Sequence, residues 1–514
     1  MISRWMALYY DMFKCLIEPP NGSETMRVET TPITAELDKE YMFADNLLQD
    51  SILKLSVPRR MRGLGISKRS GDGAVQVLFT LLVWPLLSVK SICCFAGRHL
   101  DTYLKGGIAT LYGFLRREDV DWRGLSTSVS KAAYEQLQLA GEAAESAFVF
   151  DDSIRTRRGK NVEGCSSHFD HTTRRHVMGQ QVLEMGHASP KGYLPLDRQI
   201  YVSSKKRIVR QAPFKDSRSS VARDYRTAVE CNKNEMLRSM LKRAIRAGFR
   251  ASHVLADSWF SSKENIAAGI DAGLTVIMMM KRGNLKYRFQ GREYTAAMLY
   301  QLVRRRMKPL GRRSRYMVAS LLVDLNVQAD PSKPPRWVRV RLVFSKLRTC
   351  TNDAWVVLLC SDPSRQPASI LRTYALRWGI EVYFKEAKQH LGLLREQTGC
   401  YVVHYASVHL TAMRFTLLFC ALQDSGGGPT WGQMRERISG DLLRLSFAQM
   451  TWELLKAVLY GVLDQFRPRV GEQLAKEIAT AMNQAVDEFL QAALQIDDHS
   501  VAAAVQAEAL ELAA

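Results

Sequence analysis

Apolar positions divide the chain into a helical N-terminal part, a central part with short buried strands, and a helical C-terminal part. Apolar clusters between Leu47 and Leu139 are separated by basic or glycine-rich turns, which is typical of a helical domain. Strand-like runs follow at Ala147–Phe150, His176–Met185, Tyr193–Ser203, His253–Ala256, Thr275–Met280, Tyr316–Val327 and Trp337–Phe344, with helical segments at Asn232–Ala247, Lys263–Ala272 and Val402–Leu422. This order predicts an α/β core flanked by helical regions.

Two of the predicted strands end in carboxylates. The first leads into Asp151 and Asp152, and a later one leads into Asp257. A buried strand that presents an acid at its tip can begin a metal site, although a single acid there is more often a turn or cap residue. Strand alternation alone does not decide between Asp151 and Asp152.

The segment from Tyr374 to Lys388 predicts a helix with an acid at the edge of its buried face. At about 100° per residue, Tyr374, Arg377, Glu381 and Lys388 fall within an arc of roughly 60°. Glu386 points away from this stripe, so Glu381 is the preferred candidate. Charged helix faces are also common on solvated surfaces, and an amphipathic helix without a site is the simpler alternative.

The charge of the chain points to a polyanionic partner. The formal net charge is +21, and nucleic acid is the leading candidate because phosphates neutralised by Lys and Arg release counterions. A membrane surface is less well supported, since the apolar run at 73–89 is short and contains polar residues. Nine scattered cysteines without a CxxC pair, and no apparent secretory signal, favour a reducing cytoplasm.

The spacing Tyr-x2-Arg-x3-Glu-x6-Lys resembles the signature of DDE transposases of the insertion-sequence-four family. This resemblance implies a ribonuclease H-like catalytic core in which Asp152, Asp257 and Glu381 hold two Mg²⁺ ions, for which Mn²⁺ can substitute. Asp152 is preferred because Ser153 follows it, as family members place the first acid before Ser or Thr, and Asp151 stays an alternative. Three carboxylates from separate elements suit two-metal phosphoryl transfer.

The resemblance also implies an activity and partners. The expected reaction is cleavage of double-stranded DNA at transposon terminal inverted repeats, through a hairpin intermediate, and strand transfer into target DNA by a homodimer. Tyr374, Arg377 and Lys388 are expected to bind phosphates, and Trp337 is a candidate for stacking a flipped base. The alternatives are an inactive DNA-binding relic and a metal-dependent nuclease without strand transfer. The expected location is the cytoplasm, in association with the nucleoid.

The predicted domains follow from these patterns. They are a flexible leader (1–45, with Met26 as an alternative start), a helical DNA-binding domain (46–142), the first part of the core (143–282), a β-rich basic insertion (283–352), the second part of the core with the glutamate helix (353–424) and an acidic C-terminal helical region (425–514).

Two further groups of residues have simple structural interpretations. Trp259, beside Asp257, is expected to serve packing. Cys165, His168, Asp170, His171 and His176 match no closed zinc pattern, and hydrogen bonding within a loop after the first strand is the preferred interpretation.

Overall fold

The computed structural model describes residues 47–170, 173–311, 314–349, 354–426 and 428–481. The predicted leader and its alternative start at Met26 lie outside these residues. The described chain divides into two compact units. One unit contains residues 133–389 and 398–409, and the other contains residues 47–132, 390–397 and the described residues from Leu410 onward.

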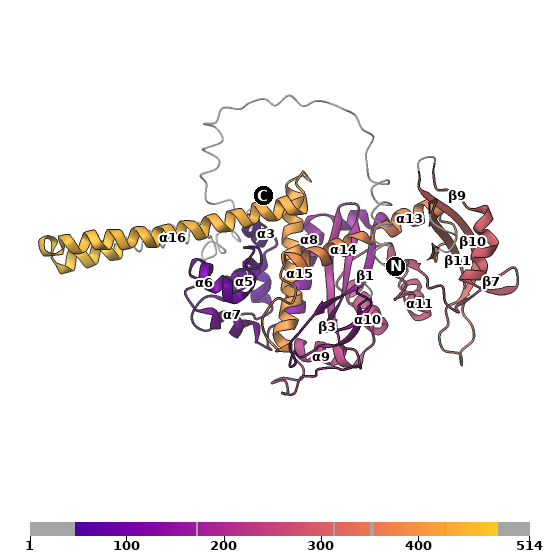
Figure 1. Cartoon of the computed structure of the whole chain (residues 1–514), viewed down its shortest axis with the longest axis horizontal. Coiled ribbons are helices and arrows are strands. Elements are labelled where there is room, and N and C mark those ends of the chain that lie inside the picture. Colours follow the sequence, from indigo (N-terminus) through magenta and orange to yellow (C-terminus); the bar gives the residue numbers. More distant parts are fainter. Residues whose placement is uncertain (1–46, 171–172, 312–313, 350–353, 427, 482–514) are drawn as a thin grey trace, which may run out of the picture. The chain divides into compact units, whose positions relative to one another are not determined.

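The first unit is a mixed α/β structure built on one twelve-stranded sheet (Figure 1). Its strands are β1 (Ala147–Thr156), β2 (Ser166–Asp170), β3 (Arg175–Ser189), β4 (Gly192–Tyr201), β5 (His253–Ala256), β6 (Thr275–Met279), β7 (Lys286–Phe289), β8 (Arg292–Thr295), β9 (Lys308–Pro309), β10 (Tyr316–Asn326), β11 (Trp337–Leu347) and β12 (Trp355–Cys360). Its helices are α9 (Ser220–Glu230), α10 (Lys233–Arg246), α11 (Lys263–Asp271), α12 (Ala296–Val303), α13 (Pro367–Ala375) and α14 (Trp378–Gln389), with short 3-10 turns at Leu139–Glu145 and Arg304–Arg306.

The sheet has a parallel centre. Its order is β2-β3-β1-β5-β6-β12-β11-β10-β7-β8, with β4 beside β3 and β9 beside β10. β1, β5 and β6 run parallel, whereas β3 and β12 border them as antiparallel strands. Central parallel strands are buried on both faces, which explains their continuous apolar runs. The strands of the predicted insertion, β7 to β11, belong to the same sheet and continue it beyond β12.

Helices cover the sheet around the carboxylate-bearing strands. α14 packs against β1, β3 and β4, while α10 packs against β3 and β4 and α11 against β6. Gly379 in α14 explains the close approach to the sheet, because a Cβ at this position would lie 2.8 Å from the Cβ of Tyr193 in β4. The sequence of α14 thus requires a glycine immediately before the apolar and acidic positions that face the sheet.

The second unit is helical. It contains α3 (Leu47–Lys54), α4 (Val57–Gly63), α5 (Ala74–Val83), α6 (Ile92–Tyr103), α7 (Ile108–Leu115), most of α8 (Trp122–Gln136), most of α15 (Tyr401–Asp424) and α16 (Trp431–Val470). Arg414 of α15 is fully buried and donates hydrogen bonds to the carbonyl oxygens of Leu82 (3.1 Å) and Leu391 (2.8 Å). The buried guanidinium thus pairs with a carbonyl near the end of α5 and with one in the segment after α14, and it holds these segments together.

Most strands and helices predicted from the apolar pattern are present. β1 continues beyond the predicted Phe150 to Thr156, and α15 closely matches the predicted helix at Val402–Leu422. One described helix, α15, is long and apolar enough to cross a membrane, and its most apolar window is completely buried inside the protein. The buried core helix of a protein that does not span a membrane can be equally long and apolar.

Candidate active site

Two aspartates directly follow the parallel pairing of β1 with β5. β1 and β5 pair with Phe150 opposite Ala256, so the next residues, Asp151 and Asp257, lie at the same end of this pairing. β5 stops there, whereas β1 continues beside β3 to Thr156. Both carboxylates are partly buried. Because paired positions on parallel strands share a face, Asp151 and Asp257 are lateral neighbours. The strand register therefore places two acids together at the centre of the sheet.

A glutamate reaches the same place from α14. Arg377, in the turn between α13 and α14, donates from Nη1 to the Asp151 carboxylate at 2.7 Å and from Nη2 to Glu381. The guanidinium thus bridges an acid of β1 and an acid of α14. Arg377 and Glu381 are four residues apart, a spacing that brings side chains together on a helix. Asp151, Asp257 and Glu381 consequently gather from three separate elements.

Asp152 lies on the other face of β1, because successive side chains of a strand alternate. Its carboxylate accepts hydrogen bonds from Lys233 Nζ at 2.7 Å and from Gln181 Nε2 at 2.6 Å. Lys233 is the first residue of α10, so this ion pair ties α10 to β1. The structure thus brings Asp151, and not the predicted Asp152, beside Arg377 and Glu381.

Burial dominates the electrostatics of the three gathered acids. It raises the pKa of Asp151 to about 6, against the opposing effect of Arg377. Burial also raises the pKa of Asp257 and of Glu381, and Arg377 again opposes it at both groups. Lys233 also acts on Asp257, and Lys388 lies near Asp151, but the raised pKa values show that these cations do not fully compensate the buried acids. Such a cluster favours any additional cation that reaches it.

Carboxylate oxygens are the ligands that hard divalent cations prefer. Among the described residues, no group of three His, Cys, Asp and Glu side chains is already placed to hold one metal ion. Arg377 occupies the position between Asp151 and Glu381. The carboxylates of Asp151, Asp257 and Glu381 therefore suit a divalent metal in their chemistry, but they are not placed to share one ion while Arg377 lies between two of them.

Tyr374 does not lie on the same helix as Glu381, contrary to the single stripe predicted from the spacing. α13 ends at Ala375, and the chain tightens through i to i+3 hydrogen bonds before α14 begins at Trp378. The Tyr374 side chain is fully buried, and its hydroxyl donates to the carbonyl oxygen of Ala256 at 3.3 Å. In this structure the Tyr374 hydroxyl is thus engaged with the protein backbone, and phosphate binding by Tyr374 stays a prediction. It supports the end of β5 immediately before Asp257.

Lys388 lies near the carboxylates, as the spacing predicts. Burial lowers the pKa of its ammonium group, and the neighbouring charges that act on it are Arg155, Asp170, Asp151 and Asp152. Asp151 and Asp152 oppose this lowering of the pKa, which places the ammonium group close to the acids of β1. Lys388 and Arg377 are thus the cations on the glutamate side of the site.

The two tryptophans singled out in the sequence differ in their surroundings. The guanidinium of Arg288 lies 3.6 Å from the ring centroid of Trp337, on the predicted base-stacking residue. Trp259, expected to serve packing, is 50% exposed. The expectation of packing rested on the large apolar ring of Trp259 and on its position two residues after Asp257. The exposure of the ring depends on neighbouring side chains that the sequence does not reveal.

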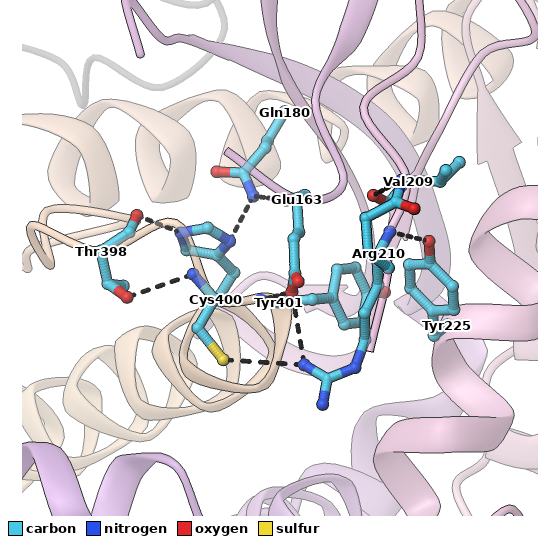
Figure 2. Close-up of polar contacts among 10 residues, drawn as sticks. Glu163, Gln180, Val209, Arg210, Tyr225, Thr398, Cys400 and Tyr401 are labelled. Carbon is cyan, nitrogen blue, oxygen red and sulfur yellow. Dashed lines mark hydrogen bonds and ion pairs between the residues drawn. The ribbon is translucent and has the colours of Figure 1, made fainter. Parts of the chain in front are cut away.

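A second polar cluster fixes the segment after β1 to the start of α15 (Figure 2). The Glu163 carboxylate accepts from the Tyr401 backbone N–H at 2.7 Å and from Arg210 Nη1 at 3.4 Å. Gln180 Nε2 lies 2.7 Å from His404 Nδ1, and the other ring nitrogen of His404 contacts the Thr398 carbonyl at 3.2 Å. A carboxylate at a helix N-terminus satisfies its unpaired N–H groups. This cluster positions α15.

The described members of the Cys/His/Asp group examined for zinc lie on or beside strands. His168 is in β2, not in a loop as expected, and its Nε2 lies 2.9 Å from Ser166 Oγ. Cys165 is buried in a bridge to Ile208, and Asp170 accepts from Thr173 Oγ1 at 2.9 Å. Hydrogen bonding is thus the observed role of the His168 and Asp170 side chains and of the Cys165 backbone.

The comparisons with known proteins support a nuclease class. Residues 87–328, just under half of the chain, match the family model described as DDE superfamily endonuclease. This match supports a DDE-type endonuclease that depends on divalent metal ions. It contains Asp151, Asp152 and Asp257 and ends before Glu381.

Two other comparisons add little. The NurA nuclease from Sulfolobus solfataricus aligns over 48% of this chain and 83% of its own, at 10% identity and a TM-score of 0.21, a similarity too low to carry an argument. None of the curated proteins searched matches this chain.

Proposed function

We propose that this protein is a DNA transposase that cleaves the ends of an insertion sequence and joins them to target DNA. The observation that carries the proposal is the gathering of Asp151, Asp257 and Glu381 around Arg377 at the end of the parallel strands. The match to the DDE superfamily endonuclease model supports the class. The signature-like spacing from Tyr374 to Lys388 favours the insertion-sequence-four type within it.

Asp151 is the better first acid of this site. It neighbours Asp257 through the β1–β5 register and shares Arg377 with Glu381, whereas Asp152 bonds Lys233 and Gln181 on the other face. In this proposal Asp151, Asp257 and Glu381 hold two divalent ions, with Mg²⁺ as the physiological metal and Mn²⁺ as a substitute. Bound in this way, the ions would activate the attacking oxygen and stabilise the leaving oxygen of phosphoryl transfer.

The surrounding side chains prepare this chemistry. Arg377 neutralises Asp151 and Glu381 before DNA arrives, and its planar fork can then turn to a phosphate. Lys388 remains as a compact cation close to Asp151. Tyr374 holds the carbonyl of Ala256 and so fixes the direction in which Asp257 leaves the sheet. Of the four signature residues, Glu381 is thus proposed as a metal ligand, Arg377 and Lys388 as phosphate-binding cations, and Tyr374 as a residue that positions the end of β5.

The arrangement of the sheet is consistent with a ribonuclease H-like core. Its order β4-β3-β1-β5-β6 joins an antiparallel β3–β4 pair to the parallel strands β1, β5 and β6, and the acid-bearing helix α14 lies against β1. Acids on the first strand, on the neighbouring parallel strand and on a late helix agree with that core. β7 to β11 then form its basic insertion.

The DNA partners are proposed from the charge of exposed residues. Arg304, Arg305, Arg306, Lys308 and Arg315 are all exposed within the insertion. A row of such cations suits the phosphates of double-stranded DNA at terminal inverted repeats and of the target. Two ends must be handled together in cut-and-paste transposition, so we propose a homodimer on DNA, acting in the cytoplasm on nucleoid DNA.

The test uses the full chain with DNA that carries the ends of its flanking element. Cleavage is measured with Mg²⁺, with Mn²⁺ and with a chelator, for the wild type and for Asp257→Asn. End-specific cuts that require metal and disappear in the variant are the expected result. Metal-independent cutting, or full activity of Asp257→Asn, would refute the proposed site. Binding to the ends without any cutting would identify an inactive DNA-binding relic.

One alternative shares the same carboxylates. A metal-dependent nuclease would cleave DNA without joining it, and the family description as an endonuclease is compatible with that outcome. The two activities are separated by supplying pre-cleaved ends and a circular target. Formation of joined products supports the transposase, whereas repeated cutting without joined products supports the nuclease.

A further inference from the structure

An arm of the sheet extends past the carboxylates at the edge opposite to the insertion strands. β1 ends at Thr156, whereas the hairpin of β2 and β3 continues beyond it to Arg175. The segment that follows β4 runs along β2, since the Ser167 N–H donates to the Lys205 carbonyl oxygen at 3.0 Å. We call residues 157–160, 166–170, 173–179 and 203–208 the basic arm.

The basic arm carries many exposed cations and almost no acid. The exposed cations are Arg158, Lys160, Arg174, Arg175, Lys205, Lys206 and Arg207. Within the described part of the chain none of them forms an ion pair, whereas the exposed cations Arg218 and Arg336 elsewhere in this unit have carboxylate partners. The single acid of the arm, Asp170, accepts a hydrogen bond from Thr173 Oγ1 at 2.9 Å. Like charges gathered without acids repel one another, and a polyanion that covers them removes this repulsion.

Lys388 connects the basic arm to the carboxylates. The neighbouring charges that act on its ammonium group are Arg155, immediately before the arm, Asp170 within the arm, and Asp151 and Asp152 at the site. Lys388 therefore lies between the acids of β1 and the arm. A positively charged path thus leads from the candidate active site to the arm.

DNA that reaches the carboxylates can cover the basic arm at the same time. Met178, which pairs with Ser167 of the arm, lies in β3 about six residues before the Glu184 that pairs with Asp151. At about 3.3 Å per residue this separation is roughly 20 Å, or about six base pairs of a duplex. The sheet order places β1 and β5 between the arm and the insertion strands. A duplex held at the acids can then extend towards the insertion on one side and towards the arm on the other.

We propose that the basic arm binds the phosphates of the duplex that flanks the element, outside its terminal repeat and about six base pairs from the cut. This inference rests on the proposed transposase function and assigns a surface to DNA whose sequence differs from one insertion to the next. Contacts to phosphates position a duplex without reading its bases, which is what DNA of variable sequence requires. The cations of the insertion then remain for the element side of the cut.

The experiment compares flanks of different length. The full chain is titrated, with Ca²⁺ in place of Mg²⁺, against duplexes that carry the same element end and a flank of about 3 or about 15 base pairs. Wild-type protein should bind the long-flank duplex about tenfold more tightly. The double variant Lys205→Ala, Arg207→Ala should lose most of this gain. Its slope of log affinity against log salt concentration should fall by about two, on the long-flank duplex only.

Two controls separate the arm from a general effect of charge. The double variant Lys242→Ala, Arg246→Ala removes two exposed cations from the second half of α10, whose first residue bonds Asp152, and it should keep the full gain from the long flank. An equal loss in both double variants would overturn the assignment to the arm. Exchange of the flank sequence at constant length should leave the wild-type affinity unchanged, and a strong sequence preference would contradict binding through phosphates.

The outcomes distinguish this inference from the proposed function. Equal affinity of the wild type for short and long flanks, or an undiminished gain in the Lys205→Ala, Arg207→Ala variant, would overturn the flank-binding surface even if metal-dependent cleavage is observed. Loss of the gain with short-flank binding intact supports the surface. If that loss is seen while the wild type cuts no DNA with any metal, the flank-binding surface stands and the transposase proposal fails.

Discussion

Adjacent aspartates on β1 provide the sharpest test of the site, because the substitutions Asp151→Asn and Asp152→Asn are chemically identical and one residue apart. Asp151 faces Arg377 and Glu381, whereas Asp152 faces Lys233 and Gln181. If Asp151 holds metal, its amide variant should be inactive and still folded. The Asp152 variant should instead be less stable and retain measurable cleavage.

The expected magnitudes follow from these surroundings. Loss of a carboxylate that holds a catalytic metal should slow cleavage by about a thousandfold or more, or roughly 4 kcal/mol in the activation free energy. Asp151→Asn removes a partner of Arg377 but also a charge that burial disfavours, so its free energy of unfolding should be nearly unchanged at neutral pH. Asp152→Asn leaves Lys233 without its 2.7 Å partner, at a cost of about 1 to 3 kcal/mol in stability.

The assay pairs denaturant unfolding with single-turnover cleavage of labelled DNA ends in Mg²⁺. Binding of the same DNA in Ca²⁺ shows whether each variant still recognises its substrate. The reasoning is refuted if Asp152→Asn is inactive at wild-type stability while Asp151→Asn cleaves normally. That result would support Asp152 as the first metal-binding acid, as expected from the Ser153 that follows it. It would also mean that β1 rearranges when metal and DNA bind.

Three further predictions concern the same edge of the sheet. Glu381→Gln should abolish cleavage with DNA binding intact, and equal loss of both in a binding and cleavage assay would instead indicate misfolding. Tyr374→Phe should lower the free energy of unfolding by about 1 kcal/mol through its lost hydrogen bond to Ala256, and a selective loss of DNA affinity in gel shifts would contradict this. Because burial raises the pKa of Asp151 to about 6 and metal binds the ionised form, Mn²⁺ affinity measured by calorimetry should fall as pH drops through 6, and a flat profile would exclude Asp151 as a ligand.

The sign of the pH effect on stability is opposite to that of the effect on metal binding. A carboxyl with a raised pKa in the folded state holds its proton there at pH values where the unfolded chain has released it. The contribution of Asp151 to stability should therefore be greatest below about pH 4 and decline as pH rises towards 6. Metal-free protein should accordingly be destabilised by ionisation of the same group that metal binding requires.

The sequence predicted local elements better than relations between them. The apolar runs of β5 and β6 and the i, i+4 pair of Arg377 and Glu381 follow from short-range periodicity, and all are present. The choice between Asp151 and Asp152 needed the register of β1 against β5, which is set by residues about a hundred positions apart. Tyr374 was misplaced because one continuous helix was assumed where the backbone tightens and begins again.

The elements that were missed have different causes. β7 and β8 are short and rich in charge, so their apolar pattern is weak. β12 is a run of six apolar residues bounded by turn signals, and its pattern was strong enough to have been recognised. The surroundings of Trp259 and Lys233 could not be predicted, because both depend on where α10 begins relative to β5.

The continuous sheet links the basic insertion to the carboxylates in a way that separate domains could not. β10 pairs with β11, β11 with β12, β12 with β6, and β6 with β5, whose end carries Asp257. Hydrogen-bonded strands keep a fixed spacing and transmit displacement more readily than a flexible linker does. DNA held by the cations that follow α12 would then be positioned relative to Asp257 as well as bound. Substitutions there should shift the position of the cut as well as weaken binding, whereas a tethered clamp would change affinity alone.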